Sequence, residues 1–193
     1  FTLFPYTTLF RSGVPFIYYG EEIGLTGSKP DENIRTPMQW SAEKFAGFST
    51  EHAWASPKPG YEKKNVAVQL ADAESLLRHY IKLIQLRNEH EALRIGTLYK
   101  VATGSTSVYA GLRVSDEEVF LIIINLSDKP IDDLKLDLSD RVLKGTYSVE
   151  DLLNGGQYAD LSAAENGSFS DYQPVTQLPA NANLVLKLTS NNK

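Results

Sequence analysis

A run of apolar residues near the start of the chain most constrains its fold. Between Gly13 and Gly20 the apolar residues are Val14, Phe16, Ile17, Tyr18 and Tyr19. The run is too short for a helix and too continuous for a strand with one face in water, so it predicts a strand buried on both faces. Such strands are typical of parallel α/β sheets.

A long connection and a helix follow this predicted strand. Residues 24–72 are rich in Gly, Pro, Ser and Asn, and a connection of this length indicates a functional loop. Residues 75–90 predict a helix, with Asp72 as a possible N-terminal cap and Gly96 beyond its end. One face of that helix carries Leu76, Leu77, Tyr80, Ile81, Leu83 and Ile84. Together the segments predict one strand, loop and helix unit.

Two separated motifs make this unit recognisable. The segment GVPFIYYGEEIG, residues 13–24, resembles the eighth barrel strand of the α-amylase family (glycoside hydrolase family 13). The hexapeptide RTPMQW, residues 35–40, resembles the loop signature of that family's α-glucosidase, oligo-1,6-glucosidase, trehalose synthase and related α-amylase members. Residues 65–93 are similar to the last barrel helix. The resemblance implies that residues 13–96 are the C-terminal end of a (β/α)8 catalytic barrel.

From about residue 97 the pattern changes to short strands separated by turns. Residues 106–114 and 119–124 flank a polar turn and predict a hairpin. Further strands are predicted at residues 131–138, 146–149 and 183–188. This spacing favours an antiparallel β-sandwich over residues 97–193. The expected fold class is therefore an α/β barrel remnant (last strand, long loop and helix) plus an all-β antiparallel sandwich as C-terminal domain.

Composition excludes some classes of function. The net charge of −5 argues against nucleic-acid binding, and the absence of cysteine excludes disulfides and thiol chemistry. The longest purely apolar run, residues 119–124, is far below the roughly 20 residues that span a bilayer, so no membrane partner is expected. The three histidines, His52, His79 and His90, lack metal-ligand spacing and are expected at the surface. We expect no metal and no cofactor.

Residues 1–12 do not continue the family pattern backwards from Gly13. One back-translation of FTLFPYTTLFRS resembles a sequencing-library adapter, so we interpret residues 1–12 as a non-native, adapter-derived leader. A natural hydrophobic extension is the alternative. A complete (β/α)8 barrel takes about 250 residues, more than the 193 of this chain. The expected partners are therefore the missing N-terminal barrel part of the same protein and an oligosaccharide substrate.

The resemblance also implies a retaining mechanism with an Asp nucleophile, a Glu acid/base and a further Asp that stabilises the transition state. Those positions precede Gly13, so we assign no catalytic residue here. The adjacent Glu21 and Glu22 cannot replace them, because neighbouring side chains in an extended segment point to opposite faces. The function expected is that of part of a glycosidase acting on α-glucosidic bonds of starch-derived or isomalto-oligosaccharides, inactive by itself.

Four residues are candidates for substrate binding: Glu22, Arg35, Gln39 and Trp40. Arg35 leads them, because a guanidinium offers several fixed donors to sugar hydroxyls; an internal salt bridge is its alternative. A structural role is favoured for Glu22, and loop support is the alternative for Gln39. Trp40 and Trp54 could stack on sugar rings, although burial under the long loop is favoured for both.

The rival function is a non-catalytic carbohydrate-binding or structural β-sandwich module in residues 97–193. A binding module would carry a row of exposed aromatic side chains on one face. The candidates for such a row are Tyr109, Tyr147, Tyr158 and Tyr172. Their positions in the predicted strands indicate no exposed row, so a structural domain is favoured over a binding one.

Overall fold

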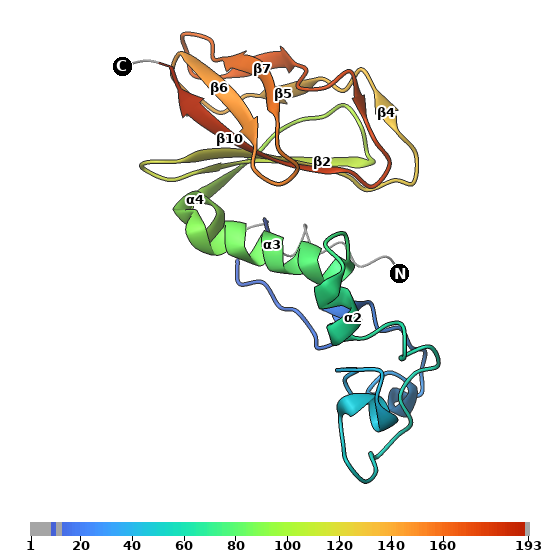
Figure 1. Ribbon diagram of the computed structural model, residues 1–193. Helices are drawn as coiled ribbons and strands as arrows, with labels where there is room; N and C mark the ends of the chain where they lie inside the picture. Colours follow the sequence, from blue (N-terminus) through green and yellow to red (C-terminus); the bar gives the residue numbers. More distant parts are fainter. Residues whose placement is uncertain (1–8, 11–12, 192–193) are drawn as a thin grey trace. The chain divides into compact units, whose positions relative to one another are not determined.

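The computed structural model describes residues 9–10 and 13–191 (Figure 1). The chain divides into two compact units, the first comprising residues 15–82 and the second residues 83–191 with residues 9–10 and 13–14. The division falls within helix α3, Leu76–Glu89. Most of the predicted leader, including its boundary at residue 12, lies outside the described residues. The chain as described is mostly antiparallel sheet with few helices.

The first unit contains short helical turns and one short α-helix before α3. These are η1 Glu21–Ile23, η2 Asp31–Asn33, η3 Lys44–Gly47 and α2 Val66–Ala71.

The strand predicted at residues 14–19 is wrong for this structure: Val14 and Phe16 are 95% and 82% exposed and no ladder forms there. A strand gains its hydrogen bonds only from a neighbouring strand, and the described residues supply none at this segment.

The predicted helix at residues 75–90 is confirmed as α3, but its cap differs. The Ser75 hydroxyl accepts a hydrogen bond from the Arg78 N–H (3.2 Å), whereas the Asp72 carboxylate accepts from Glu74 N–H (3.0 Å), before the helix begins. On the predicted apolar face, Leu76 and Ile84 are exposed at 40% and 36%. The buried face consists of Leu77, Tyr80, Leu83 and Leu86, a stripe shifted around the helix.

The second unit is built on a six-stranded antiparallel sheet with the order β1-β2-β3-β10-β6-β7 (Figure 1). Its strands are β1 Thr97–Lys100, β2 Val108–Val114, β3 Val119–Asn125, β6 Thr146–Asp151, β7 Gln157–Ser162 and β10 Asn183–Ser190. The predicted hairpin is confirmed, since β2 and β3 pair directly from Val108 opposite Asn125 to Val114 opposite Val119. The predicted strands at residues 146–149 and 183–188 are also present.

Two short ladders complete the second unit. Strand β4 Ile131–Asp132 pairs with β9 Gln177–Leu178, and β5 Leu136–Leu138 pairs with β8 Phe169–Tyr172. The strand predicted over residues 131–138 is therefore broken in two, at Asp133, whose φ of 50° is incompatible with an extended strand.

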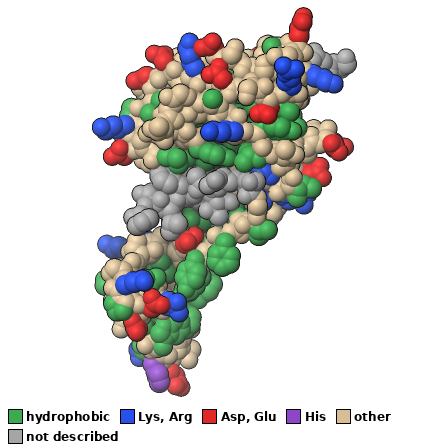
Figure 2. All heavy atoms as spheres, turned by 180° about the vertical axis from the view of Figure 1, so that it is seen from behind, with side chains coloured by type: hydrophobic (Ala, Val, Ile, Leu, Met, Phe, Trp, Pro, Cys, Tyr) green, Lys and Arg blue, Asp and Glu red, His purple; other side chains and the backbone are tan. Residues whose placement is uncertain are grey.

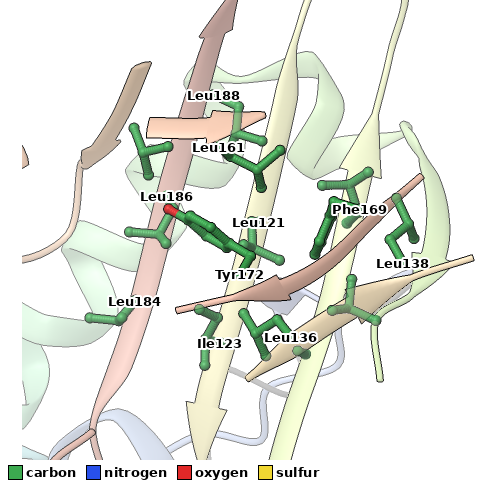
Figure 3. Packing of buried hydrophobic residues seen from close by; sticks show 14 of the residues in the cluster. Leu121, Ile123, Leu136, Leu138, Leu161, Phe169, Tyr172, Leu184, Leu186 and Leu188 are labelled. Carbon is green, nitrogen blue, oxygen red and sulfur yellow. The ribbon is translucent and has the colours of Figure 1, made fainter. Parts of the chain in front are cut away.

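One hydrophobic core joins the short ladders to one face of the large sheet. Leu136, Leu138, Phe169 and Tyr172 from the ladders pack in the same cluster as sheet residues. Figure 3 shows them beside Leu121, Ile123, Leu161, Leu184, Leu186 and Leu188. Leu134, Leu136 and Leu138, which alternate with charged residues in the predicted strand at residues 131–138, are all buried. The alternation of apolar and polar residues in this segment thus matches the side that faces the core.

Helix α4, Glu91–Arg94, packs on the large sheet within the second unit. The buried guanidinium of Arg113 on β2 donates from Nε to the Ala92 carbonyl (3.1 Å). Burial lowers the pKa of Arg113, and the nearby Arg87 lowers it further.

A search of the described residues for a helix long and apolar enough to cross a membrane finds none.

Candidate functional site

A tight turn positions Glu22 at the start of the first unit. Gly20 and Gly24 flank η1 with φ angles of 87° and 69°, the left-handed region that glycine adopts without strain. The Leu25 N–H closes the turn on the Gly20 carbonyl (2.8 Å), and a side chain at position 20 would collide with Leu25. Glu22 therefore occupies a fixed position between two glycines.

The Glu22 side chain has an unsatisfied oxygen. Its Oε2 atom is buried, and no described residue donates a hydrogen bond to it. Thr36 Oγ1, in the RTPMQW motif, is likewise buried without a partner among the described residues. A buried oxygen that lacks a donor raises the free energy of the folded state, so both atoms can accept a further hydrogen bond.

Arg35 lies at the surface beside an aspartate. Its Nη2 atom is 3.0 Å from Asp31 Oδ2, and the two side chains are 66% and 56% exposed. The internal salt bridge that was the alternative role for Arg35 is therefore present, with Asp31 as its partner. An exposed pair of this kind is worth about 0–1 kcal/mol, so the guanidinium is accessible to a ligand at little cost.

Gln39 is buried and supports the loop. Its side chain is 1% exposed, its Nε2 donates to the Lys64 carbonyl (2.5 Å) and its Oε1 accepts from the Lys58 N–H (3.2 Å). The Gln39 carbonyl accepts from the Val66 N–H (2.9 Å), at the start of α2. Both amide atoms are thus used by backbone groups of the same loop.

The two tryptophans are exposed, which corrects the expectation that both are buried. Trp40 is 50% and Trp54 64% exposed. Neither tryptophan belongs to the buried cluster of the first unit, which consists of Ile23, Met38 and Leu77 with Leu25, Val66 and Ile81 at its edge. Figure 2 shows hydrophobic side chains on the surface of this unit, in the lower part of the view.

The backbone around these aromatics is nevertheless well ordered by hydrogen bonds. Trp40 N–H donates to the Ala46 carbonyl (2.9 Å), and its own carbonyl accepts from Ala67 N–H (3.0 Å). Trp54 Nε1 donates to the Arg35 carbonyl (2.9 Å), and its ring meets Phe48 edge to face at 5.0 Å. Trp54 is therefore fixed directly against the backbone of Arg35, a contact that sequence spacing did not indicate.

Tyr19 connects the apolar segment to the RTPMQW motif. Its hydroxyl donates to the Thr36 carbonyl (3.1 Å), and its ring lies 4.8 Å from that of Tyr18. Burial raises the pKa of Tyr19, and the neighbouring Tyr18 raises it further. The hydroxyl is thus held protonated as a donor. The sequence pattern indicated Tyr19 only as part of a strand, because a contact over 17 positions leaves no periodic signal.

Neither unit assembles a metal centre from the residues that the structure describes: no group of three or more His, Asp or Glu side chains could hold an ion. Of the site candidates, the structure places Arg35 and Trp40 at the surface, Glu22 half-buried and Gln39 inside the loop. Arg35 is in direct contact with Trp54, while Trp40 follows Gln39 at the point where the loop backbone meets α2.

Comparison with known proteins covers both halves of the chain. Residues 2–96 match the family model described as the catalytic domain of alpha-amylase. The chain is 36% identical over 117 residues to Alpha-amylase 3 of Dictyoglomus thermophilum, covering 60% of this chain and 23% of that protein. It is 31% identical over 154 residues to an oligo-1,6-glucosidase of Parageobacillus thermoglucosidasius, covering 61% and 27%. The chain thus spans about a quarter of the length of these relatives.

Solved structures extend the likeness to nearly the whole chain. A trehalose-6-phosphate hydrolase of Bacillus licheniformis matches with a TM-score of 0.67 and 25% identity, over 92% of this chain and 36% of that one. The trehalulose synthase of Pseudomonas mesoacidophila, at 24% identity and a TM-score of 0.67 over 95% and 37%, shows the same fold. With the GEEIG turn and the RTPMQW loop, these matches establish that the chain belongs to the α-amylase family, glycoside hydrolase family 13.

Proposed function

We propose that this chain is the C-terminal part of a retaining glycosidase that acts on α-glucosidic bonds of starch-derived or isomalto-oligosaccharides. The observation that carries the proposal is the match of residues 2–96 to the alpha-amylase catalytic domain. Relatives named for α-1,6 bonds support the substrate class, among them a glucan 1,6-alpha-glucosidase of Streptococcus pneumoniae that is 31% identical over 156 residues.

In this proposal, residues 13–24 are the segment that closes a (β/α)8 barrel and pairs as a strand only beside the preceding barrel strands, and residues 97–193 are a β-sandwich that follows it. The exposure of Val14 and Phe16 supports the first part, because apolar side chains of a barrel strand need neighbouring strands to cover them. The common core of the short ladders and the large sheet supports the second.

Arg35 is the proposed contact to the sugar, and three residues act beside it. Its exposed guanidinium can donate to sugar hydroxyls or to a carboxylate of the cleft. Trp40 offers an exposed aromatic face, whereas Glu22, whose Oε2 is buried and lacks a donor among the described residues, has the structural role favoured from the sequence. Gln39, whose amide is already bonded to the loop backbone, contributes by positioning its neighbours Met38 and Trp40.

Catalysis needs two carboxyl groups about 5–5.5 Å apart across the bond in a retaining enzyme. Within the proposal, both come from barrel strands that precede residue 13. Glu21 and Glu22 lie next to each other in one helical turn and so do not face each other across a bond. The chain alone is therefore proposed to bind sugar without cleaving it.

A non-catalytic β module is the second candidate, and the β unit offers little for binding. Tyr147 and Tyr172 are buried in the core, and the Tyr172 hydroxyl donates to the Ala159 carbonyl (2.8 Å). Tyr109 and Tyr158 are partly buried. Because none of the four is exposed, a structural role for residues 97–193 is favoured over sugar binding.

The test is calorimetric titration of the purified chain with isomaltotriose and maltotriose. The native chain is expected to bind one of them, and Arg35→Ala to weaken binding by about tenfold, as loss of a charged hydrogen bond does. Lys63→Ala, a change at an exposed cation of the same loop, serves as the matched control and should bind like the native chain. Equal affinities for both variants would refute the role of Arg35.

The same preparations are assayed with a chromogenic α-glucoside and soluble starch. No turnover above a buffer control is expected, because the proposal places the nucleophile and the acid/base outside this chain. Turnover that survives further purification would overturn that placement.

A further inference from the structure

The Trp54 side chain is held by a hydrogen bond from its indole N–H, but most of the residue is exposed to solvent. Its indole N–H is bonded to the Arg35 carbonyl at 2.9 Å, and Phe48 meets the ring at 5.0 Å with an interplanar angle of 85°. Despite these two contacts, the residue is 64% exposed. An indole that is only tethered by its polar edge does not gain the burial that normally stabilises a tryptophan.

This arrangement suits a ligand that covers an aromatic face. The C–H groups of a pyranose ring form a flat apolar surface that can lie on an indole, while its hydroxyls point outwards to polar groups. Because the hydrogen bond and the Phe48 contact already restrain the ring, binding would cost little side-chain entropy. Exposed, pre-ordered aromatic rings of this kind are effective binding anchors.

Polar groups for the hydroxyls are present on the residue that anchors the indole and on its ion-pair partner. The carbonyl that accepts the Trp54 N–H belongs to Arg35, so the exposed guanidinium is on the residue that anchors the ring. Asp31, ion-paired with Arg35 at 3.0 Å, adds acceptor oxygens. An exposed aromatic ring whose anchoring residue supplies a donor, with an acceptor on the ion-pair partner of that residue, matches a neutral sugar better than it matches a purely apolar partner.

We propose that Trp54 is a stacking platform for a pyranose ring of the oligosaccharide, acting next to Arg35. The proposal rests on the proposed function, because it assigns Trp54 to the same substrate. Phe48 is a positioning residue in this arrangement, since its ring lies 5.0 Å from that of Trp54 and nearly at right angles to it.

The chain contains two tryptophans, so fluorescence can isolate one of them. Trp40→Phe keeps an aromatic face at position 40 and leaves Trp54 as the sole indole, so titration with isomaltotriose should give a saturable change in Trp54 emission. Sorbitol, which has hydroxyls but no pyranose ring, is the control ligand and should leave the emission unchanged. An equal response to sorbitol would overturn stacking.

Affinity provides the second readout, by calorimetry in the chain with Trp40 intact. Trp54→Ala should raise the Kd for isomaltotriose at least about tenfold, the effect of losing an aromatic anchor. Phe16→Ala, which removes another highly exposed aromatic side chain of the first unit, is the matched control and should leave the Kd within about twofold. Circular dichroism spectra that match the native one exclude unfolding as the cause.

The outcomes separate this inference from the function on which it rests. If isomaltotriose binds and Arg35→Ala weakens binding while Trp54→Ala does not, the platform is refuted and the proposed function stands. If Trp40→Phe binds the sugar by calorimetry without a change in Trp54 emission, the platform is also refuted. If no tested sugar binds the native chain, both proposals fail.

Discussion

At the scale of single residues, the RTPMQW motif identified the family, but its spacing did not determine which side chains turn inward. Thr36 to Gln39 are all buried, whereas Trp40 is half exposed. The inward position of Gln39 depends on backbone groups of Lys58 and Lys64, 19 and 25 positions away. Local propensity contains no information about such partners, so a sugar contact and loop support were equally compatible with the sequence.

The buried amide of Gln39 makes a stability prediction. Gln39→Met keeps the volume but leaves the Lys64 carbonyl and the Lys58 N–H without their partner. The free energy of unfolding of the first unit should fall by about 1–3 kcal/mol, the cost of leaving buried polar groups unpaired. Urea unfolding followed by tryptophan fluorescence measures it. Lys63→Met, at an exposed position of the same loop, should change stability by less than about 0.5 kcal/mol.

At the scale of elements, alternating apolar residues predicted four strands of the large sheet, whereas β1, β7 and β8 were not predicted. Strands β2, β3, β6 and β10 were expected, because each presents an apolar face to the core. Strand β7 was missed, since Leu161 is its one buried residue. The strand predicted at residues 14–19 is absent for a different reason. The composition of this segment favours a strand, but strand pairing depends on neighbours elsewhere in the fold.

A cluster of His90, Glu118 and Lys187 connects the α3–α4 junction to the sheet. His90 was expected at the surface, but its side chain is mostly buried in this cluster. His90 Nδ1 lies 2.7 Å from Glu118 Oε1, with the two side chains 15% and 19% exposed. Ala92 N–H donates to Glu118 Oε2 (3.3 Å), and Lys187 Nζ on β10 lies 3.7 Å from Oε1. Desolvation alone would raise the pKa of Glu118, but the His90 and Ala92 hydrogen bonds and the charges of His90 and Lys187 outweigh it, so the pKa is lowered.

This cluster predicts a pH-dependent loss of stability. Because the pKa of Glu118 is lower in the folded state, its contribution is complete above the ordinary value of 4.5 and disappears as the pH falls through the lowered value. At pH 7, Glu118→Gln should cost about 1–2 kcal/mol, and the gap from the native chain should close in acid. Thermal unfolding across this pH range measures the gap. Glu117→Gln, at the neighbouring exposed position, is the control, and a gap that persists below the folded pKa would contradict the prediction.

At the scale of the whole molecule, the two units have very different cores. The second unit buries a large cluster that joins its large sheet to both short ladders (Figure 3). Among the described residues, the buried cluster of the first unit is small and contains Ile23, Met38 and Leu77, while Phe16, Trp40 and Trp54 are exposed. Burial of apolar surface is the main source of stability, so the first unit should be the weaker of the two. Sequence composition could not show this, because both halves are rich in apolar residues.

The difference predicts two separate unfolding transitions, and the chain contains its own probes for them. Both tryptophans, Trp40 and Trp54, lie in the first unit, so their fluorescence should change at a lower urea concentration than the far-UV circular dichroism of the sheet. Ile23→Ala should move only the fluorescence transition, and Leu186→Ala only the dichroism transition, each by about 2–5 kcal/mol, because each removes a fully buried side chain. Coincident transitions, or one variant that moves both, would instead mean that the chain unfolds as a single cooperative structure.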